Sequence, residues 1–454
     1  MKKISRRSML EGMGLALGGS LLGCATARAP APSSPRTGNA PPNFVFIYAD
    51  DLGYGDLGCY GAEKIRTPHL DRMAADGARF TSFYSCACVC TPSRAGLLTG
   101  RYPIRTGLTR VLNQNSQDGI DDREITLGGA LKACGYATAI IGKWHLGHLP
   151  QYLPTRHGFD SYFGLPYSND MNKKGDVPCP PLIRNETVIE EPAAQDTLTQ
   201  RYTAEALQFI RVNKDRPFFL YLPHTMPHVP LHASEAFRGK SAGGLFGDVV
   251  EELDWSVGQI LEELKRLELE ERTLVIFSSD NGPWLVQKDN GGSAGILREG
   301  KGTTFEGGVR EPTIARWPGV IEPGRVEPKP AIMLDWFPTL VGLAGGAVPT
   351  DRVMDGMDIC GLLLKGQRRA HDDFFFYRNE EFEAHRSGPW KLKRPFKGNL
   401  FGKDATHPLL LFNLETDPGE TTNLAAQYPE IVKRLHHQMT KFALELGPIT
   451  PTKR

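Results

Sequence analysis

The sequence predicts an α/β fold in which a largely parallel sheet is flanked by helices, followed by a small antiparallel sheet with one helix. Two observations support this fold class. From residue 42 to about residue 365, apolar runs typical of buried strands alternate with amphipathic helical patterns, as in a parallel sheet with helical crossovers. After residue 367 the runs are separated only by Gly, Pro and Asn, which favours antiparallel pairing. A chain of 454 residues has room for two or three such units.

The first unit should contain four strands with helices between them. The strands are expected at residues 44–48, 136–141, 218–222 and 274–277. One helix should begin at Thr67-Pro68, with Thr as its cap and Pro in its first turn, and end at Gly77. Two longer helices are expected where apolar side chains recur at helical spacing, in residues 198–210 and 249–264.

The second unit should be a sheet of short strands with a terminal helix. The strands are expected at residues 374–377, 382–386, 390–393 and 409–413. The helix is expected because four apolar side chains fall on one of its faces, namely Ile431, Leu435, Met439 and Phe442. We expect this unit to pack against the first one and to form part of a cleft wall.

The first 23 residues have the features of an export signal. Charged residues precede a Gly-rich apolar stretch at residues 12–23, and they are Lys2, Lys3, Arg6, Arg7 and Glu11. Residues 5–10 resemble a twin-arginine (Tat) signal, the type that exports folded proteins. Residues 21–24 resemble a lipoprotein processing box in which Cys24 would be acylated, and ordinary cleavage near residues 25–29 is the alternative. The Ala-, Pro- and Ser-rich stretch that follows is typical of a flexible tether.

These features divide the chain into four predicted segments. They are an export signal at residues 1–23, a tether at residues 24–42, the α/β domain at residues 43–367 and a C-terminal α+β subdomain at residues 368–454. The segments predict an exported protein, either periplasmic or lipid-anchored at the cell envelope of a bacterium. Contact with a membrane would occur only through the lipid anchor.

The charge balance excludes binding driven by a global electrostatic field. Lys and Arg number 53 against 52 Asp and Glu, so the net charge is +1, and nucleic acid is not an expected partner. Loss of residues 1–23 removes four positive charges and one negative charge, which brings the net charge to −2. An anionic substrate must therefore be held by a local cluster of cations.

Polar side chains follow each of the four predicted strands of the first unit. They are Asp50 and Asp51, then Lys143 and His145, then His224 and His228, and finally Asp280 and Asn281. Ligands of open α/β sheets bind outside the carboxyl ends of the strands, so we expect these side chains to lie together. Three carboxylates and one amide are hard oxygen ligands that suit Ca²⁺ or Mg²⁺. The alternative is that the acidic groups are turn or helix-cap residues and the histidines are buried and hydrogen-bonded.

The most informative segment is residues 90–101, which begins with Cys90. Thr91 and Pro92 suit a helix start and Gly100 suits its end, so Cys90 should lie just before a helix N-terminus, where an anion is favoured. Arg94, one turn into the helix, could add guanidinium donors. Three alternatives remain: a buried structural thiol, a plain reactive thiol, or a metal cluster of Cys90 with Cys86 and Cys88, for which no fourth ligand lies nearby.

The run Cys90-Thr91-Pro92-Ser93-Arg94 resembles the C-x-P-S-R signature of the sulfatase family, in its arylsulfatase A-like branch. The resemblance extends through Thr99-Gly100-Arg101 and covers nearly all residues from 43 to the C-terminus. It implies an alkaline-phosphatase-like mixed, largely parallel sheet. It also implies that Cys90 is oxidised to Cα-formylglycine, whose hydrated gem-diol is the nucleophile, by a formylglycine-generating maturation enzyme.

The resemblance implies a role for each polar group. The ligands of one Ca²⁺ ion, in preference to Mg²⁺, would be Asp50, Asp51, modified Cys90, Asp280 and Asn281. The catalytic groups would be Cys90, Arg94, Lys143, His145, His228 and Lys301, and the substrate-binding groups would be Lys143, Ser168, His228 and Lys301. The family motif favours His228 over His224, because His228-Val229-Pro230 preserves the step that follows the functional histidine.

These roles predict a sulfuric ester hydrolase that converts a sulfate monoester into an alcohol and inorganic sulfate. The substrate would be a sulfated small molecule or oligosaccharide, with a carbohydrate sulfate preferred over an aryl sulfate. Three loops should shape the leaving-group pocket, at residues 110–121, 168–191 and 232–247. Two other functions remain as alternatives: a phosphodiesterase or phosphonate monoester hydrolase of the alkaline phosphatase superfamily, and a catalytically inactive surface binding lipoprotein.

Overall fold

The computed structural model of the chain describes residues 41–367, 373–398 and 406–446. The predicted export signal, Cys24 and most of the tether lie outside the described residues, as does the predicted boundary between residues 367 and 368. Within the described ranges, no helix is long and apolar enough to cross a membrane.

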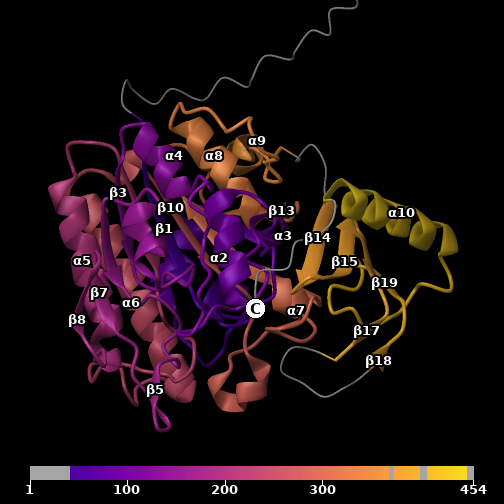
Figure 1. The fold of residues 1–454 in the computed structure, drawn as a ribbon, viewed down its shortest axis with the longest axis horizontal. Helices are drawn as coiled ribbons and strands as arrows, with labels where there is room; N and C mark the ends of the chain where they lie inside the picture. The colour runs from indigo at the N-terminus through magenta and orange to yellow at the C-terminus, as the bar shows by residue number, and fades with distance from the viewer. Residues whose placement is uncertain (1–40, 368–372, 399–405, 447–454) are drawn as a thin grey trace, which may run out of the picture. The chain divides into compact units, whose positions relative to one another are not determined.

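The core of the molecule is an 11-stranded mixed sheet (Figure 1). Its central strands run parallel and are β4 (Ser161–Gly164), β3 (Ala137–Ile141), β9 (Phe218–Pro223), β1 (Asn43–Ala49) and β10 (Thr273–Ser279). Beyond β10 lie β11 (Arg310–Arg316), β2 (Ala78–Tyr84), β12 (Arg325–Glu327) and β13 (Ala331–Ile332), and beyond β4 lie β7 (Leu182–Arg184) and β8 (Thr187–Glu190). The prediction of a largely parallel sheet is confirmed, and the four expected strands form its centre.

The sequence analysis missed β11 and β2, which pair antiparallel beside β10. The β11 sequence, Arg-Glu-Pro-Thr-Ile-Ala-Arg, contains charged residues and proline, so it lacks the apolar run expected of a buried strand. Six of its seven residues are nevertheless buried. Arg310 donates to the Thr81 carbonyl of β2 and Thr313 bonds Ser278 of β10, whereas the Glu311 carboxylate is buried without a hydrogen-bond partner among the described residues. A local sequence pattern does not reveal such contacts.

Alternate residues of β1 point to the two faces of the sheet, and each face is covered by helices. Phe44, Phe46 and Tyr48 join one apolar cluster, whereas Val45 and Ile47 join the other. The first cluster includes side chains of α2 (Cys90–Thr99), α4 (Leu127–Ala133) and α8 (Trp336–Leu343). The second includes side chains of α1 (Pro68–Ala75), α5 (Leu198–Val212) and α6 (Gly244–Arg266). Four of these helices were predicted, namely α1, α2, α5 and α6.

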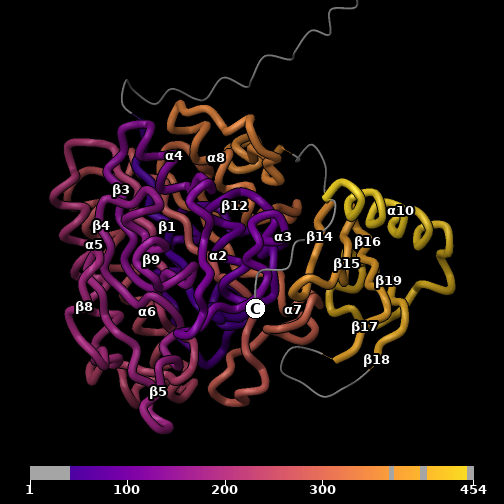
Figure 2. The backbone as a smooth tube through the Cα atoms, in the orientation of Figure 1, coloured from indigo at the N-terminus to yellow at the C-terminus, as the bar shows by residue number. Residues whose placement is uncertain are grey.

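The C-terminal sheet is antiparallel and is covered on one face by α10 (Pro429–Leu446) (Figure 2). Its strand order is β14 (Asp373–Arg378), β15 (Glu381–Ser387), β16 (Trp390–Lys393) and β19 (Leu410–Asn413), in agreement with the prediction. Leu435 and Met439 of α10 pack on Leu392 and Leu411 of the sheet. The smaller elements are β5 (Lys173–Lys174), β6 (Val177–Pro178), β17 (Phe396–Lys397), β18 (Thr406–His407), α3 (Pro103–Thr106), α7 (Glu306–Val309) and α9 (Cys360–Lys365).

Candidate active site

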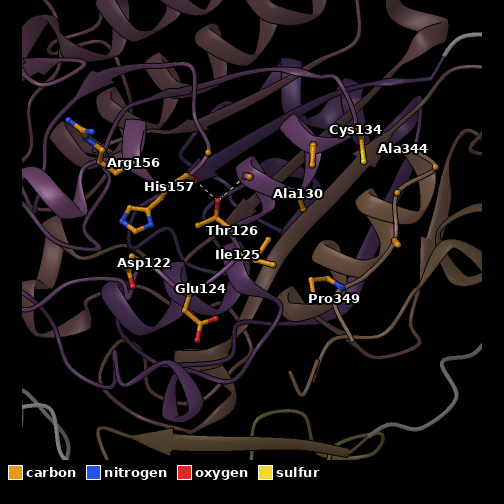
Figure 3. Close-up of a pocket in the computed structure, with 16 residues that line it drawn as sticks. Asp122, Glu124, Ile125, Thr126, Ala130, Cys134, Arg156, His157, Ala344 and Pro349 are labelled. Atoms are coloured by element: carbon orange, nitrogen blue, oxygen red, sulfur yellow. Dashed lines mark hydrogen bonds between the residues drawn. The ribbon is translucent and has the colours of Figure 1, made fainter. Parts of the chain in front are cut away.

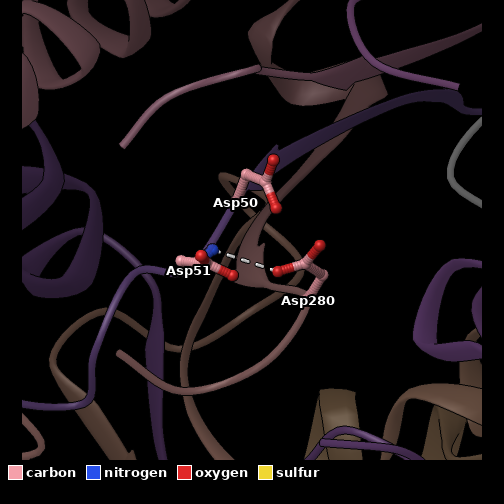
Figure 4. Close-up of side chains that lie close together, drawn as sticks. All are labelled: Asp50, Asp51 and Asp280. Atoms are coloured by element: carbon pink, nitrogen blue, oxygen red, sulfur yellow. Dashed lines mark hydrogen bonds between the residues drawn. The ribbon is translucent and has the colours of Figure 1, made fainter. Parts of the chain in front are cut away.

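Three carboxylates meet at the carboxyl ends of β1 and β10 (Figure 4). One oxygen from each of Asp50, Asp51 and Asp280 lies within 4.8 Å of the others, and all three side chains are buried. The Asp51 N–H donates to Asp280 Oδ1 at 3.1 Å, and Asn281 Nδ2 donates to Asp51 Oδ1 at 2.8 Å. Parallel pairing of β1 with β10 aligns Ala49 with Ser279, so the residues that follow each strand are brought side by side.

The donor set of this cluster fits a divalent cation. Burial and the Asp50 carboxylate raise the pKa of Asp280 to about 7, because three buried carboxylates repel one another. Among the described residues, the buried Oδ1 of Asn281 has no hydrogen-bond partner. Carboxylate and amide oxygens are the ligands that Ca²⁺ prefers. A calcium ion held by Asp50, Asp51, Asp280 and Asn281 would relieve the repulsion and satisfy the amide oxygen.

Each carboxylate is contacted by at least one cationic side chain, and Asp50 by two, since Arg94 Nη2 also lies 3.4 Å from its Oδ1. Lys143 Nζ lies 2.5 Å from Asp50 Oδ2, and Lys301 Nζ lies 2.7 Å from Asp51 Oδ2. Arg94 donates from Nε and Nη2 to Asp280 Oδ2, at 3.0 and 2.8 Å. Burial alone would lower the pKa of Lys301, but the Asp51 carboxylate outweighs this effect and the pKa is raised. The Asp280 carboxylate likewise outweighs burial and raises the pKa of Arg94, so Arg94 and Lys301 are held charged inside the site.

Cys90 occupies the first residue of α2, one position further into the helix than expected. Burial raises the pKa of its thiol, although the nearby Lys143 and Lys301 act to lower it. Thr91 Oγ1 accepts from the Leu112 N–H at 3.2 Å and donates to the His145 carbonyl at 3.0 Å. Gly100 ends the helix with φ +67°, as its position in the sequence predicts.

The alternative of a cysteine metal cluster finds no support within the described ranges. There, only the three aspartates bring three or more potential ligands together. Cys86 and Cys88 are free thiols in the apolar cluster beneath α2, and burial raises the pKa of Cys88 to about 12. They have the character of buried structural thiols.

His145 is held in one tautomer by the backbone. Its Nε2 lies 2.7 Å from the Leu112 carbonyl, which can only accept, so Nε2 carries the proton. The Nδ1 atom is buried and has no hydrogen-bond partner among the described residues. Burial, reinforced by Lys143, lowers the pKa of His145 well below its ordinary value. The ring is therefore neutral, with a bare nitrogen available to accept a proton.

His228 has the opposite tautomer. Its Nδ1 lies 2.5 Å from the Val229 carbonyl and 3.1 Å from Asn169 Oδ1, so the proton belongs on Nδ1. The Nε2 atom lies 3.6 Å from Asp51 Oδ2, and Ser168 Oγ is 3.3 Å away. Burial and the charge of Lys301 lower the pKa of His228. Ser168 Oγ also accepts a hydrogen bond from Lys143 Nζ at 3.2 Å, so this serine links His228 with Lys143.

His224 lies apart from this group. Its ring packs against Tyr202 of α5, with ring centroids 6.2 Å apart, and burial lowers its pKa to about 3. His224 is a buried core histidine, which was the alternative interpretation of the histidines that follow the predicted strand. The structure thus brings together every other predicted site residue, namely Asp50, Asp51, Cys90, Arg94, Lys143, His145, Ser168, His228, Asp280, Asn281 and Lys301.

Two residues of the site were missed by the sequence analysis. Asn169 fixes the His228 ring, and the Trp284 ring lies beside both His228 and Lys301. Asn169 is adjacent to Ser168, and Trp284 lies four residues after Asp280 on the same strand-end loop. Their positions next to predicted site residues were the available signal.

A separate cavity of about 720 Å³ lies between α4, the 156–158 segment and the loop after α8 (Figure 3). Its lining includes Glu124, Cys134, Arg156, His157 and Pro349, and none of the site residues described above. The Thr126 side chain caps α4 from within this region. The cavity is therefore distinct from the six charged residues Asp50, Asp51, Asp280, Arg94, Lys143 and Lys301, which we call the catalytic cluster after the roles predicted for them.

Comparison with known proteins identifies relatives over nearly the whole chain. The sulfatase family profile matches residues 42–347, and the profile described as N-sulphoglucosamine sulphohydrolase, C-terminal, matches residues 300–445. Human arylsulfatase A is 41% identical over 89% of this chain and 88% of that enzyme. Human N-acetylgalactosamine-6-sulfatase is 39% identical over 90% of this chain and 87% of that enzyme.

Solved structures agree with these relationships. A Bacteroides thetaiotaomicron structure from a study of glycosaminoglycan metabolism has a TM-score of 0.81 at 30% identity, over 88% of this chain and 99% of that one. The sulfatase PsFucS1 from Pseudoalteromonas sp. also has a TM-score of 0.81, at 29% identity, over 90% of this chain and 92% of that one. A phosphonate monoester hydrolase from Silicibacter pomeroyi, at 17% identity and a TM-score of 0.65, shares the fold.

Proposed function

The chain belongs to the sulfatase family of sulfuric ester hydrolases, and we propose that it removes sulfate from a carbohydrate using formylglycine made from Cys90 and one calcium ion. The observation that carries the proposal is the position of Cys90. It is buried at the start of α2, within the electrostatic field of Lys143, Lys301, Asp50 and Asp280. In the reaction, a sulfate monoester and water give an alcohol, inorganic sulfate and one proton.

Two groups absent from the encoded chain would contribute to this chemistry. Calcium, held by Asp50, Asp51, Asp280 and Asn281, supplies a Lewis acid for a sulfate oxygen. Hydrated formylglycine supplies two hydroxyl groups on one carbon, one to bond to sulfur and one to release sulfate.

The cationic side chains would bind and orient the sulfate. Lys143 and Lys301 are fixed by the aspartates at 2.5 and 2.7 Å, so their ammonium groups need no rearrangement when an anion arrives. Arg94 is fully buried and has three partners, since besides Asp280 it contacts Asp50 at 3.4 Å and donates to the Lys143 carbonyl at 3.0 Å. Preorganised charge of this kind stabilises negative charge that develops on the ester oxygens.

The two histidines are suited to opposite proton transfers. The bare Nδ1 of His145 can accept a proton from a hydroxyl group at residue 90. The Nε2 of His228 faces Asp51 and Ser168 and carries no proton in the neutral ring, so it would first take up a proton, which the Asp51 carboxylate favours, and then deliver it to the leaving alcohol. The lowered pKa values of both rings keep them from binding protons permanently at neutral pH.

The proposal is tested on protein co-expressed with a formylglycine-generating enzyme. Mass spectrometry of the tryptic peptide that contains Cys90 should show formylglycine, and sulfate release should disappear in Cys90→Ala and after calcium removal by a chelator. Full activity with an unmodified cysteine would disprove the mechanism. Faster turnover of nitrophenyl phosphate diesters than of nitrophenyl sulfate would instead favour the phosphodiesterase alternative.

The carbohydrate substrate is supported by the names of relatives, which include N-acetylgalactosamine-6-sulfatases and a solved structure in complex with k-i-k-neocarrahexaose. A screen of oligosaccharides from carrageenan, ulvan, fucan and glycosaminoglycans, with nitrophenyl sulfate for comparison, identifies the class. Sulfate release from none of the saccharides, with strong release from the aryl ester, would contradict it.

The N-terminal sequence supports a proposal about location. The twin-arginine signal would carry the folded protein out of the cytoplasm after Cys90 has been modified, and acylation of Cys24 would anchor it. Radiolabelled palmitate should enter the wild-type protein and not Cys24→Ala. Active exported protein from cells without the maturation enzyme would contradict the order of modification and export.

A further inference from the structure

We propose that Trp284 is a platform for the ring of the leaving alcohol and so determines substrate specificity. The inference rests on the proposed sulfatase function. The ring that lies against the indole would be the pyranose of a sugar sulfate or the aromatic ring of an aryl sulfate, since both present a flat apolar face.

The loop after β10 places Trp284 beside the sulfate-binding groups. Trp284 lies four residues after Asp280, and the carbonyl of the intervening Pro283 accepts from the Lys301 N–H at 2.9 Å. A Cβ atom on Gly300 would lie 2.2 Å from the same carbonyl oxygen, so the two segments are in close backbone contact. The position of the indole is therefore fixed relative to Lys301 by the backbone.

The indole contacts both groups that face the ester. Lys301 Nζ lies 4.4 Å from the ring centroid of Trp284, and the ring centroid of His228 lies 5.5 Å away at an angle of 47°. His228 and Lys301 are only 3% and 6% exposed, whereas Trp284 is partly exposed. The indole thus borders the buried sulfate-binding groups and is itself partly open to solvent, so a leaving alcohol that extends from these groups toward solvent along this edge would pass over it.

The residues after Trp284 extend the apolar surface. Leu285 and Val286 are 40% and 49% exposed, although each is a large apolar side chain. Leu285 lies near Gly300, since its Cγ would be 3.1 Å from a Cβ atom built there. An apolar surface at the edge of a highly charged site is suited to the face of a ring, because stacking on an indole adds to the free energy of burial.

A second role for Trp284 must be distinguished from this one. A cation–π contact of this kind can position Lys301 without any contact to the substrate. A positioning residue would affect every sulfate ester alike, and it would also affect inorganic sulfate. A platform would affect only ligands that carry a ring.

The experiment uses calcium-loaded protein with Cys90→Ala, so that ligands bind without turnover. Calorimetry measures the dissociation constants of a sulfated N-acetylhexosamine, 4-nitrophenyl sulfate and inorganic sulfate. Adding Trp284→Ala should weaken ring-bearing ligands about three- to tenfold and leave inorganic sulfate unchanged. Trp284→Phe should retain most of the affinity. A loss confined to one ring-bearing ligand identifies the ring that the platform accepts.

The matched control is Trp390→Ala. Trp390 is a partly buried tryptophan of the C-terminal sheet, and its ring packs on Tyr428. The substitution should change none of the three constants. In active enzyme, Trp284→Ala should raise KM for the ring-bearing substrate with little change in kcat. Equal weakening of inorganic sulfate, or no change for any ligand, overturns the inference. Failure of the unsubstituted enzyme to release sulfate from any ester overturns the proposed function instead.

Discussion

Two buried ionic clusters lie at opposite ends of residues 301–306, and their carboxylates respond differently to burial. At one end, Lys301 belongs to the catalytic cluster, where burial and the charge of Asp50 raise the pKa of Asp280 to about 7. At the other end, burial would likewise raise the pKa of Glu306, but Lys391 and the neighbouring arginines outweigh it and lower the pKa to about 2. Asp280 therefore lacks sufficient positive charge, whereas Glu306 does not. Their neighbours differ from them: burial would raise the pKa of Asp50, but Lys143 and Arg94 outweigh it and lower the pKa, and burial raises the pKa of Glu420.

The contacts explain this difference. Glu306 Oε1 lies 2.8 Å from Lys391 Nζ, and its Oε2 accepts from Tyr84 Oη at 2.6 Å and from Arg310 Nη1 at 3.3 Å. The Glu306 N–H donates to Glu420 Oε2 at 2.6 Å, and Lys391 also contacts Glu420 at 3.1 Å. We call Glu306, Glu420 and Lys391 the C-terminal cluster. The C-terminal cluster shares Lys391 between its two carboxylates, whereas the repulsion on Asp280 in the catalytic cluster would be relieved by the proposed cation.

The largest effect is expected from Lys391→Met, which removes the shared cation of the C-terminal cluster. Two buried carboxylates would lose their partner, and breaking a buried ion pair in this way costs about 3–5 kcal/mol. The free energy of unfolding, measured with urea, should fall by this amount, and calcium should not restore it. The exposed Lys397→Met is the control and should leave stability unchanged. Rescue by calcium would show that the two clusters are not independent.

Lys301→Met sharpens the comparison, because it removes a cation from the catalytic cluster. Loss of a preorganised charge at the reacting group should lower kcat by about 10²–10³-fold. In chelator, the unpaired Asp51 should also destabilise the fold. Calcium should restore much of that stability but not the activity, because the ion compensates Asp51 without contacting the leaving group. A stability loss that is the same with and without calcium would contradict this account.

The catalytic cluster could be predicted from the sequence because its geometry follows from one rule. Asp50, Lys143 and Asp280 each follow a strand, and parallel strands bring their carboxyl ends to one edge of the sheet. The sulfatase signature then indicated Cys90 and Arg94. The distinction between His224 and His228 came from that resemblance, since both follow β9 and no local pattern separates them.

The C-terminal cluster could not be predicted in this way. The β16 sequence, Trp-Lys-Leu-Lys, alternates as expected for a strand with one apolar face and one solvated face. The apolar face is correct, since Leu392 packs under α10. The polar face is also buried, because Lys391 lies against Glu306 of the first unit. Burial of that face depends on the docking of the C-terminal unit on the first unit. The alternation of side chains along one strand does not predict that docking.

The contributions of Glu306 and Glu311 to stability should respond to pH in opposite ways. Glu306 has its pKa lowered to about 2 from an ordinary value of 4.5, so its contribution to stability is present above pH 4.5 and is lost as the pH falls toward 2. Burial and the charge of Asp280 raise the pKa of Glu311 well above its ordinary value, so its contribution is present in acid and is lost as the pH rises.

Glutamine substitutions test this contrast. Glu306→Gln should destabilise the protein at pH 7, and its difference from the unsubstituted protein should shrink below pH 4.5. Glu311→Gln should be neutral or stabilising at pH 7, because the neutral amide resembles the protonated carboxyl group that the fold favours. Unfolding free energies at pH 3.5, 5 and 7 would check both expectations. Destabilisation by Glu311→Gln that equals that of Glu306→Gln at pH 7 would contradict them.

The smallest effect is expected from Thr91→Val, which alters a link between the start of α2 and His145. The hydroxyl joins the His145 carbonyl to the Leu112 N–H, and the Leu112 carbonyl in turn holds His145 Nε2. Valine keeps the shape and removes both hydrogen bonds, so stability should fall by about 1–2 kcal/mol. Thr99→Val, at the other end of the same helix, removes a bond to the Ala95 carbonyl at 2.7 Å and a longer one from the Arg101 N–H at 3.4 Å, and should cost about 1 kcal/mol. Only Thr91→Val should also lower kcat, by about three- to tenfold, because it would loosen the orientation of the imidazole that we propose as the proton acceptor. If the two variants lowered kcat equally, the orientation of His145 would not depend on this link.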